Sequence, residues 1–179
     1  MKNPIQKQLG SLLFNAALFN LRDYFKNINP RKVNFGDIDN ILKANGLSIP
    51  QDINDIAFSL TTWPEWLDFL SVFKDKLEYV SELWDCDDYA EFVQVMSAFS
   101  MLINTAGKVH CTVYNADTGA LIAGHFCNLI LTSDNQIYIY DLDNYFWGKS
   151  GNSGWTKYNK SQKTIIGNWE YRNFDRVAF

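Results

Sequence analysis

Apolar residues in the first part of the chain recur at three- and four-residue steps, the spacing of one face of an α-helix. The pattern predicts an amphipathic helix over residues 5–26, a helix from Asp37 to Ala44 that Asn45 and Gly46 close, and further helices over residues 66–80 and 85–104. Most of the apolar positions in these segments suit an ordinary core.

After Gly107 the apolar pattern changes to β-branched and aromatic runs. Turn signals at residues 117–119 and 133–135 separate three of these runs, KVHCTVYN, ALIAGHFCNLILT and QIYIYDL, and predict a three-stranded antiparallel meander. A later run, KTIIGNWEYR, is a further strand candidate. We therefore expect an α+β fold in a single domain, 1–179, with a helical part (1–80) packed on a part made of one helix and an antiparallel sheet (81–179).

Composition narrows the class of protein. The chain has 179 residues, 47% of them hydrophobic, and a net charge of -4, so we expect a packed core and no nucleic-acid partner. No run approaches the ~20 apolar residues that cross a bilayer, and Asn15 and Asn20 interrupt the apolar N-terminal stretch. We expect no signal peptide or transmembrane segment and a cytoplasmic or virion-associated protein. Three cysteines, an odd number, favour a free thiol over a disulfide scaffold.

The segment WDCDDYAEF, residues 84–92, is the most informative for chemistry. Asp85 is a natural N-cap and Asp88 suits the return half of a capping box, which places Cys86 in the first helical turn. The helix dipole there favours a thiolate, and a free backbone amide can bind an oxyanion. Neighbouring carboxylates raise a thiol pKa unless they serve as caps, ion pairs or metal ligands. The alternative is that Cys86 is a small buried core residue.

A thiolate enzyme needs an imidazole and an acceptor that orients it. His125 follows Gly124 in the second predicted strand, and the next strand ends at Asp141. If residues 133–135 form a three-residue loop, His125 falls opposite Asp143 and Asp141 becomes its diagonal neighbour on the same face. A two-residue turn would shift the register by one residue and place His125 and Asp141 on opposite faces of the sheet. Chain order and register together make His125 and Asp141 partners for the thiol.

Two alternatives concern the other His and Cys residues. His110 lies in the preceding strand, where a structural role is favoured because no helix start and no acceptor accompany it. The rival site is zinc, with Cys86, His110, Cys111, His125 and Cys127 as its candidate ligands. Structural zinc sites bring ligands in short-spaced pairs across loops, whereas these residues are adjacent or alternate along strands, so zinc is disfavoured.

The order of these motifs resembles a known group of enzymes. A cysteine in a WDCDDYA helix start, a GHFCN strand and an acidic residue sixteen positions after the histidine are similar to papain-like and transglutaminase-like cysteine enzymes. The likeness is closest to the C-terminal cysteine-protease domain of agglutinins of the Marasmius oreades type and to related bacterial and phage proteins. It covers about residues 80–145. The resemblance implies that Cys86 is the nucleophile, His125 the general base and acid, and Asp141 the group that orients the imidazole.

The chain departs from that family in several ways. The family has glutamate where Asp141 stands, and the nearest upstream glutamine is Gln51, so the side-chain oxyanion donor is unassigned. The lectin portion has no counterpart, so the resemblance does not imply sugar binding. Family members depend on calcium-like ions, which makes Asp85, Asp87 and Asp88 candidate ligands, although helix capping explains the same carboxylates and is favoured.

These observations predict a cysteine-dependent acyl-transfer enzyme, a hydrolase of the thiol-protease or transglutaminase-like type, that uses a Cys86-His125-Asp141 triad on protein or peptide substrates. The sequence requires no cofactor, and calcium is the single candidate. The alternative is a catalytically inactive member of the fold that acts as a binding or structural protein, for example in a virion. The aromatic-rich segment NYFWGKSGNSGWTKY suggests a protein partner in that case.

Overall fold

The structure, a computed structural model, describes residues 20–47, 51–52, 57–73, 86–142 and 154–179. Its helices are α2 (Phe35–Ala44), α3 (Trp63–Phe73) and α4 (Cys86–Met101), and residues 20–24 are also helical. Its strands in chain order are β1 (Arg31–Asn34), β2 (Gln51–Asp52), β3 (Ala57–Leu60), β4 (Ala106–Asn115), β5 (Leu121–Leu131), β6 (Ile137–Tyr140), β7 (Trp155–Lys157), β8 (Thr164–Ile166) and β9 (Trp169–Ala178).

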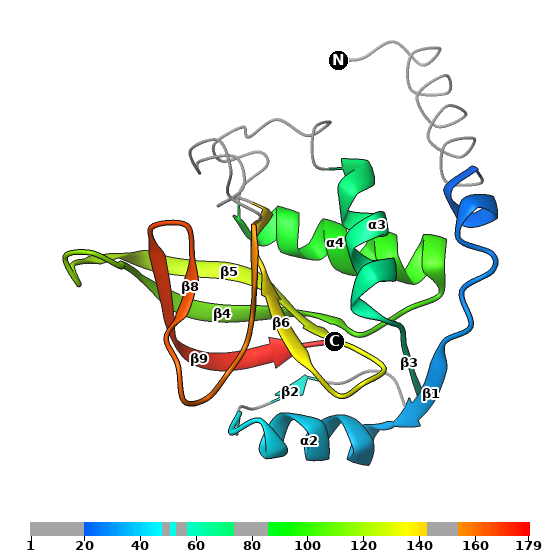
Figure 1. The fold of residues 1–179 in the computed structure, drawn as a ribbon, viewed down its shortest axis with the longest axis horizontal. Helices are drawn as coiled ribbons and strands as arrows, with labels where there is room; N and C mark the ends of the chain where they lie inside the picture. Colours follow the sequence, from blue (N-terminus) through cyan, green and yellow to red (C-terminus); the bar gives the residue numbers. More distant parts are fainter. Residues whose placement is uncertain (1–19, 48–50, 53–56, 74–85, 143–153) are drawn as a thin grey trace, which may run out of the picture.

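One seven-stranded sheet dominates the molecule (Figure 1). Its strand order is β2-β9-β4-β5-β6-β7, and β8 pairs with β9. All pairs are antiparallel except β2 with β9. The sheet curls until β7 contacts β8, which gives it a barrel-like form. Strands β1 and β3 pair separately as an antiparallel ribbon.

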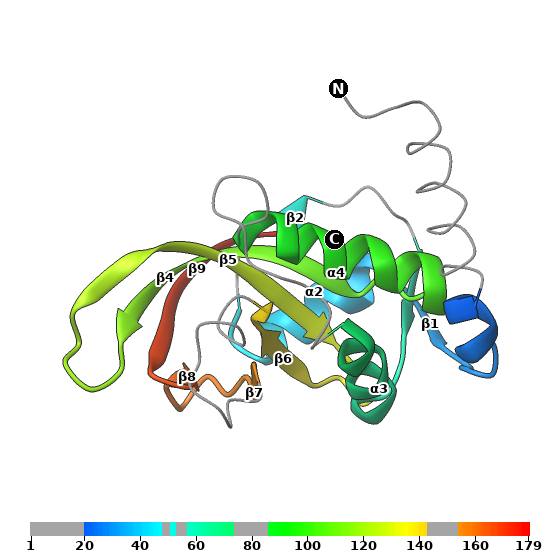
Figure 2. The ribbon, with the colours of Figure 1, turned by 90° about the horizontal axis from the view of Figure 1, so that it is seen from above.

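The two faces of the sheet bury different cores because side chains alternate along each strand. Leu129 on β5 and Ile137 on β6 pack in one core with Ile38 and Leu42 of α2. Ile130 and Tyr138, one residue along each strand, pack in the other core with residues of α3 and α4. Figure 2 shows α4 lying along β4 and β5, so this helix covers one face of the central strands.

Local signals explain where α2 begins and ends. The side chain of Asn34 accepts a hydrogen bond from the amide of Asp37, and the Asp37 carboxylate accepts one from the amide of Asn34, both at 3.0 Å. This capping box satisfies amides that the first helical turn leaves free. Gly46, with a φ of 78°, takes the left-handed conformation that follows many helices. The predicted helix from Asp37 to Ala44 is confirmed, with two more residues at its start.

The predicted α+β fold, with a helical first half packed on a sheet, was wrong. The described residues contain more strand than helix, and β1, β2 and β3 all lie in the segment predicted as helical. These strands have two to four residues each, too short for a period-two pattern to show. Their pairing partners are distant in sequence, so only the tertiary structure reveals them.

The predicted meander of β4, β5 and β6 is confirmed. Thr132 donates its amide to the carbonyl of Gln136 at 3.1 Å, which is the three-residue loop that the register argument required. The strand candidate KTIIGNWEYR is two strands, β8 and β9, because Gly167 turns the chain with a φ of 58°. No helix within the described ranges has the length and apolar character to span a membrane.

Candidate functional site

The predicted histidine and its acidic partner meet beside the end of β6. His125 lies on β5 and Asp141 directly follows β6, and both side chains are buried. The Nε2 atom of His125 lies 2.8 Å from Oδ2 of Asp141. The hydroxyl of Tyr171, on β9, donates to the same carboxylate oxygen. Two donors from different strands therefore hold one carboxylate, which orients the imidazole as the sequence register predicted.

This environment raises the pKa of His125 from its ordinary 6.5 to about 11. Burial by itself lowers the pKa, because it penalises the charged ring. The charge of Asp141 and its hydrogen bond outweigh burial, and the hydrogen bond and charge of Cys86 add to them. His125 is therefore an imidazolium at neutral pH.

Cys86 is the first residue of α4, as predicted, and its side chain is half-buried. Its hydrogen bond to the His125 ring brings the thiol into the same cluster as His125 and Asp141. A cationic imidazole beside a thiol at a helix N-terminus is an arrangement that stabilises a thiolate. The structure thus unites the three residues singled out in the sequence, while their functional roles stay a proposal.

The other cysteines lie beneath this cluster. Cys111 and Cys127 are buried on β4 and β5, with their sulfur atoms 4.0 Å apart. Burial raises the pKa of Cys127 well above its usual range, so it is a neutral thiol. His110 points to the opposite face of the sheet, against Asp175 and Phe126. Within the described ranges no three His, Cys, Asp or Glu side chains form a metal-binding group, so the zinc alternative has no geometric support.

The acidic residues proposed as calcium ligands are placed only in part. Asp87 and Asp88 lie in the first turn of α4, and Oδ2 of Asp87 is 3.7 Å from Nζ of Lys108. Asp85 and Asp143 lie outside the described residues, as does most of the aromatic segment NYFWGKSGNSGWTKY.

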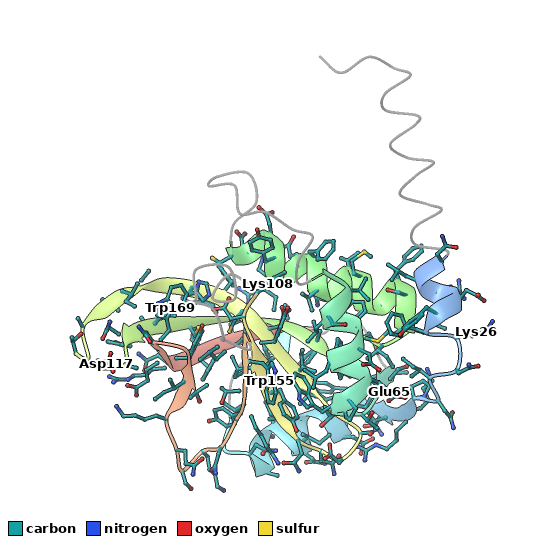
Figure 3. The ribbon with its side chains drawn as sticks, turned by 45° about the horizontal axis from the view of Figure 1, so that its top comes forward. Lys26, Glu65, Lys108, Asp117, Trp155 and Trp169 are labelled. Atoms are coloured by element: carbon teal, nitrogen blue, oxygen red, sulfur yellow. The ribbon has the colours of Figure 1, made fainter. Side chains whose placement is uncertain are left out.

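A cleft that the sequence did not reveal lies on the α4 side of the sheet. Its volume is about 730 Å³, and it opens between α4 and the strands β4, β5 and β9. Figure 3 shows Lys108, one of its lining residues, close to α4. The other lining residues are Glu91, Gln94, Val95, His110, Phe126, Asp175, Arg176 and Ala178. Lys108 and His110 lie two residues apart on β4 and give one face of this otherwise apolar strand a polar character. That polar face was the signal in the sequence that could have indicated the cleft.

The cleft pairs acidic with basic groups around an aromatic ring. Lys108 donates to Glu91 at 2.6 Å, and its ammonium nitrogen lies 4.8 Å from the centroid of the Phe126 ring. Nδ1 of His110 lies 2.8 Å from the Asp175 carboxylate. A Cβ at Gly124 would approach the His110 ring to 3.3 Å, so the missing side chain leaves room for the imidazole.

Comparison with known proteins gives a fold but no family. No family model matches, and no curated protein matches. A solved structure described as "PSL1a-E64 complex" matches with a TM-score of 0.52 and 13% identity, over 83% of this chain and 50% of that chain. A Polyporus squamosus lectin bound to a human-type influenza-binding epitope matches with a TM-score of 0.48 and 12% identity, over 72% of this chain and 48% of that one. The chain therefore spans about half the length of the structure whose fold it shares.

These comparisons contradict several sequence predictions. The predicted membership of the papain-like or transglutaminase-like enzymes was wrong: no family model matches, and the solved structure whose fold the chain shares is that of PSL1a. The predicted acyl-transfer activity, with its hydrolase and thiol-protease class and its protein or peptide substrate, is corrected for the same reason. The motif order misled because three short segments specify a local arrangement, and a local arrangement does not establish turnover.

Proposed function

We propose that this protein is a binding protein without turnover and that its ligand is a carbohydrate held in the cleft beside α4. The observation that carries the proposal is the composition of the cleft, where paired charges surround an aromatic ring. This is the binding alternative that the sequence left open. The sequence resemblance gave no reason to expect sugar binding, so the ligand class rests on the cleft.

The polar groups of the cleft match the hydroxyl groups of a sugar. Each sugar hydroxyl both donates and accepts hydrogen bonds, so a site needs both partners side by side. Glu91 and Asp175 supply acceptors, and Lys108 and Arg176 supply donors. Because two acidic side chains, Glu91 and Asp175, share the cleft with two basic ones, Lys108 and Arg176, the site has little net charge to attract an ion. A neutral pyranose fits this balance better than an anionic ligand does.

The apolar groups of the cleft match the other part of a sugar, its carbon-bound hydrogens. Phe126 is half-buried and Val95 is 60% exposed, so both offer apolar surface at the cleft. An aromatic ring beside a few oriented polar groups is the usual composition of a small-molecule site. The fold shared with PSL1a adds no ligand to this argument.

The proposal is tested by measuring binding of the protein to a glycan array and then by calorimetric titration of the protein with methyl pyranosides. We expect saturable binding that Asp175→Asn and Phe126→Ala each weaken by about tenfold or more, because each removes a ligand contact worth on the order of 1–2 kcal/mol. Asp117→Asn, at the tip of the β4–β5 hairpin, is the matched control and should bind as the unmodified chain does. Absence of any glycan binding, or equal affinity in all three variants, would refute the proposal.

Three sequence predictions remain proposals beside this one. Cys86, His125 and Asp141 form a reactive thiol site, supported by their contacts, without implying turnover. Residues 1–179 form a single domain. For Asp85, Asp87 and Asp88 helix capping is the favoured role and calcium binding the alternative; if calcium binds, excess calcium raises the unfolding temperature relative to a chelator and Asp88→Asn abolishes the rise.

A further inference from the structure

The outer edge of β5 lacks a neighbouring strand over half its length. On one side, β4 pairs with β5 along almost all of that strand, from Leu121 to Ile130. On the other side, β6 pairs only with Asn128–Leu131. Within the part of the chain that the structure describes, no strand pairs with the outer edge from Leu121 to Cys127. The β4–β5 hairpin extends beyond the body of the molecule (Figures 1 and 2), and Leu121–Gly124 are exposed there, whereas His125 and Cys127 are buried.

The sequence of this edge lacks the features that normally prevent strand addition. Residues 118–124 read TGALIAG and contain no charged residue, no His and no Pro. Leu121 and Ile122 are 62% and 46% exposed, and they point to opposite faces because they are adjacent on a strand. Proteins usually protect exposed edges with charges, prolines or bulges, and an uncharged apolar edge is a template for another strand.

We propose that the β5 edge pairs antiparallel with the same edge of a second copy of this chain. An antiparallel strand supplies both donors and acceptors along one edge, so it is complementary to its own two-fold copy. The absence of charge along residues 118–124 means that two copies meet without repulsion, and no complementary charge is present to select a different partner.

The side chains favour a register centred on Ile122. A two-fold axis perpendicular to the sheet keeps every side chain on its own face, so the central residue must face its own copy. With Ile122 at the axis, Leu121 of one copy faces Ala123 of the other, and Ala120 faces Gly124. On the face that carries Leu121, this large side chain therefore meets the small side chain of Ala123, which lets the two strands approach to the normal spacing. The paired copies extend the sheet and cover exposed apolar surface on both faces.

Sedimentation velocity of the full chain over a range of concentrations tests this interface. We expect concentration-dependent dimers. Ile122→Lys should raise the dimer dissociation constant by at least about tenfold, because two like charges would face each other at the axis. Ile165→Lys is the matched control: Ile165 is also an exposed apolar residue on a strand, at 37% exposure, but it lies on β8, so its dimers should persist.

Cross-linking provides a second measurement that does not depend on tolerance of a charge. Under oxidised glutathione, Ile122→Cys should form an intermolecular disulfide in higher yield than Ile165→Cys or the unmodified chain, with two thiols oxidised and one glutathione disulfide reduced. The proposal is overturned by a monomer at every concentration, by dimers that Ile122→Lys leaves intact, by equal cross-linking at both positions, or by an edge that binds an unrelated extended peptide and not its own copy.

Discussion

Replacing Asp141 by Asn removes a buried negative charge while keeping the size and shape of the side chain. The carboxylate accepts hydrogen bonds from His125 and Tyr171, and the amide oxygen of Asn can accept in the same place. Both His125 and Asp141 are buried, so water can do little to stabilise the imidazolium once the carboxylate charge is removed. The substitution therefore isolates the electrostatic effect of the carboxylate on the imidazolium.

The size of the effect follows from the pKa of His125, which is about 11 in the folded chain and has an ordinary value of 6.5. A raised pKa means that the folded state binds the proton more tightly than the unfolded state does. The stabilisation is complete below pH 6.5 and is lost as the pH rises towards 11. At about 1.4 kcal/mol per pKa unit, it amounts to about 5 kcal/mol at pH 7 and about 3 kcal/mol at pH 9. The upper figure agrees with the cost of roughly 3–5 kcal/mol for breaking a buried ion pair.

Urea unfolding of the unmodified chain and of Asp141→Asn at several pH values measures this difference directly. We expect the gap in the free energy of unfolding to narrow by about 1.4 kcal/mol for each pH unit between 7 and 10. Nitrogen chemical shifts of the His125 ring should show an imidazolium at pH 9 in the unmodified chain and a neutral ring in the variant. A gap that is constant over this range, or a neutral ring in the unmodified chain at pH 8, would refute the reasoning.

Two other predictions concern a thiol and a close contact. Iodoacetamide at pH 7 should alkylate Cys86 and spare the two buried cysteines, and His125→Ala should slow the reaction at Cys86 at least about tenfold. Peptide mass spectrometry measures the extent and the rate of alkylation at each cysteine. Equal labelling of all three cysteines would contradict the prediction. Gly107→Ala would place a Cβ 2.5 Å from Val177 and should cost about 1–3 kcal/mol of stability. Gly119→Ala meets no atom within 4 Å and should cost only about 1 kcal/mol, from its φ of 70°, so thermal unfolding that ranks the two variants the other way would contradict the packing argument.

The predictions that held depended on neighbours in sequence. The strands β4 to β6 follow from alternating apolar residues and from the turn residues between them, and the loop at 133–135 sets the register that brings His125 to Asp141. The position of Cys86 in the first turn of α4 was likewise predicted from its neighbours in sequence. In each case the physical cause acts within one strand, one turn or one hairpin.

The predictions that failed depended on residues far apart in the chain. The segments 31–34 and 57–60 carry no strand pattern, and they are strands only because they pair with each other. The cleft requires α4, β4, β5 and β9 to converge, and the accessible edge of β5 exists because β6 ends after four residues. The amino-acid sequence by itself determines local elements and their short-range register, since dihedral preferences and side-chain alternation act locally. Only the tertiary structure decides which edges are covered and which polar side chains meet, because those outcomes depend on long-range pairing.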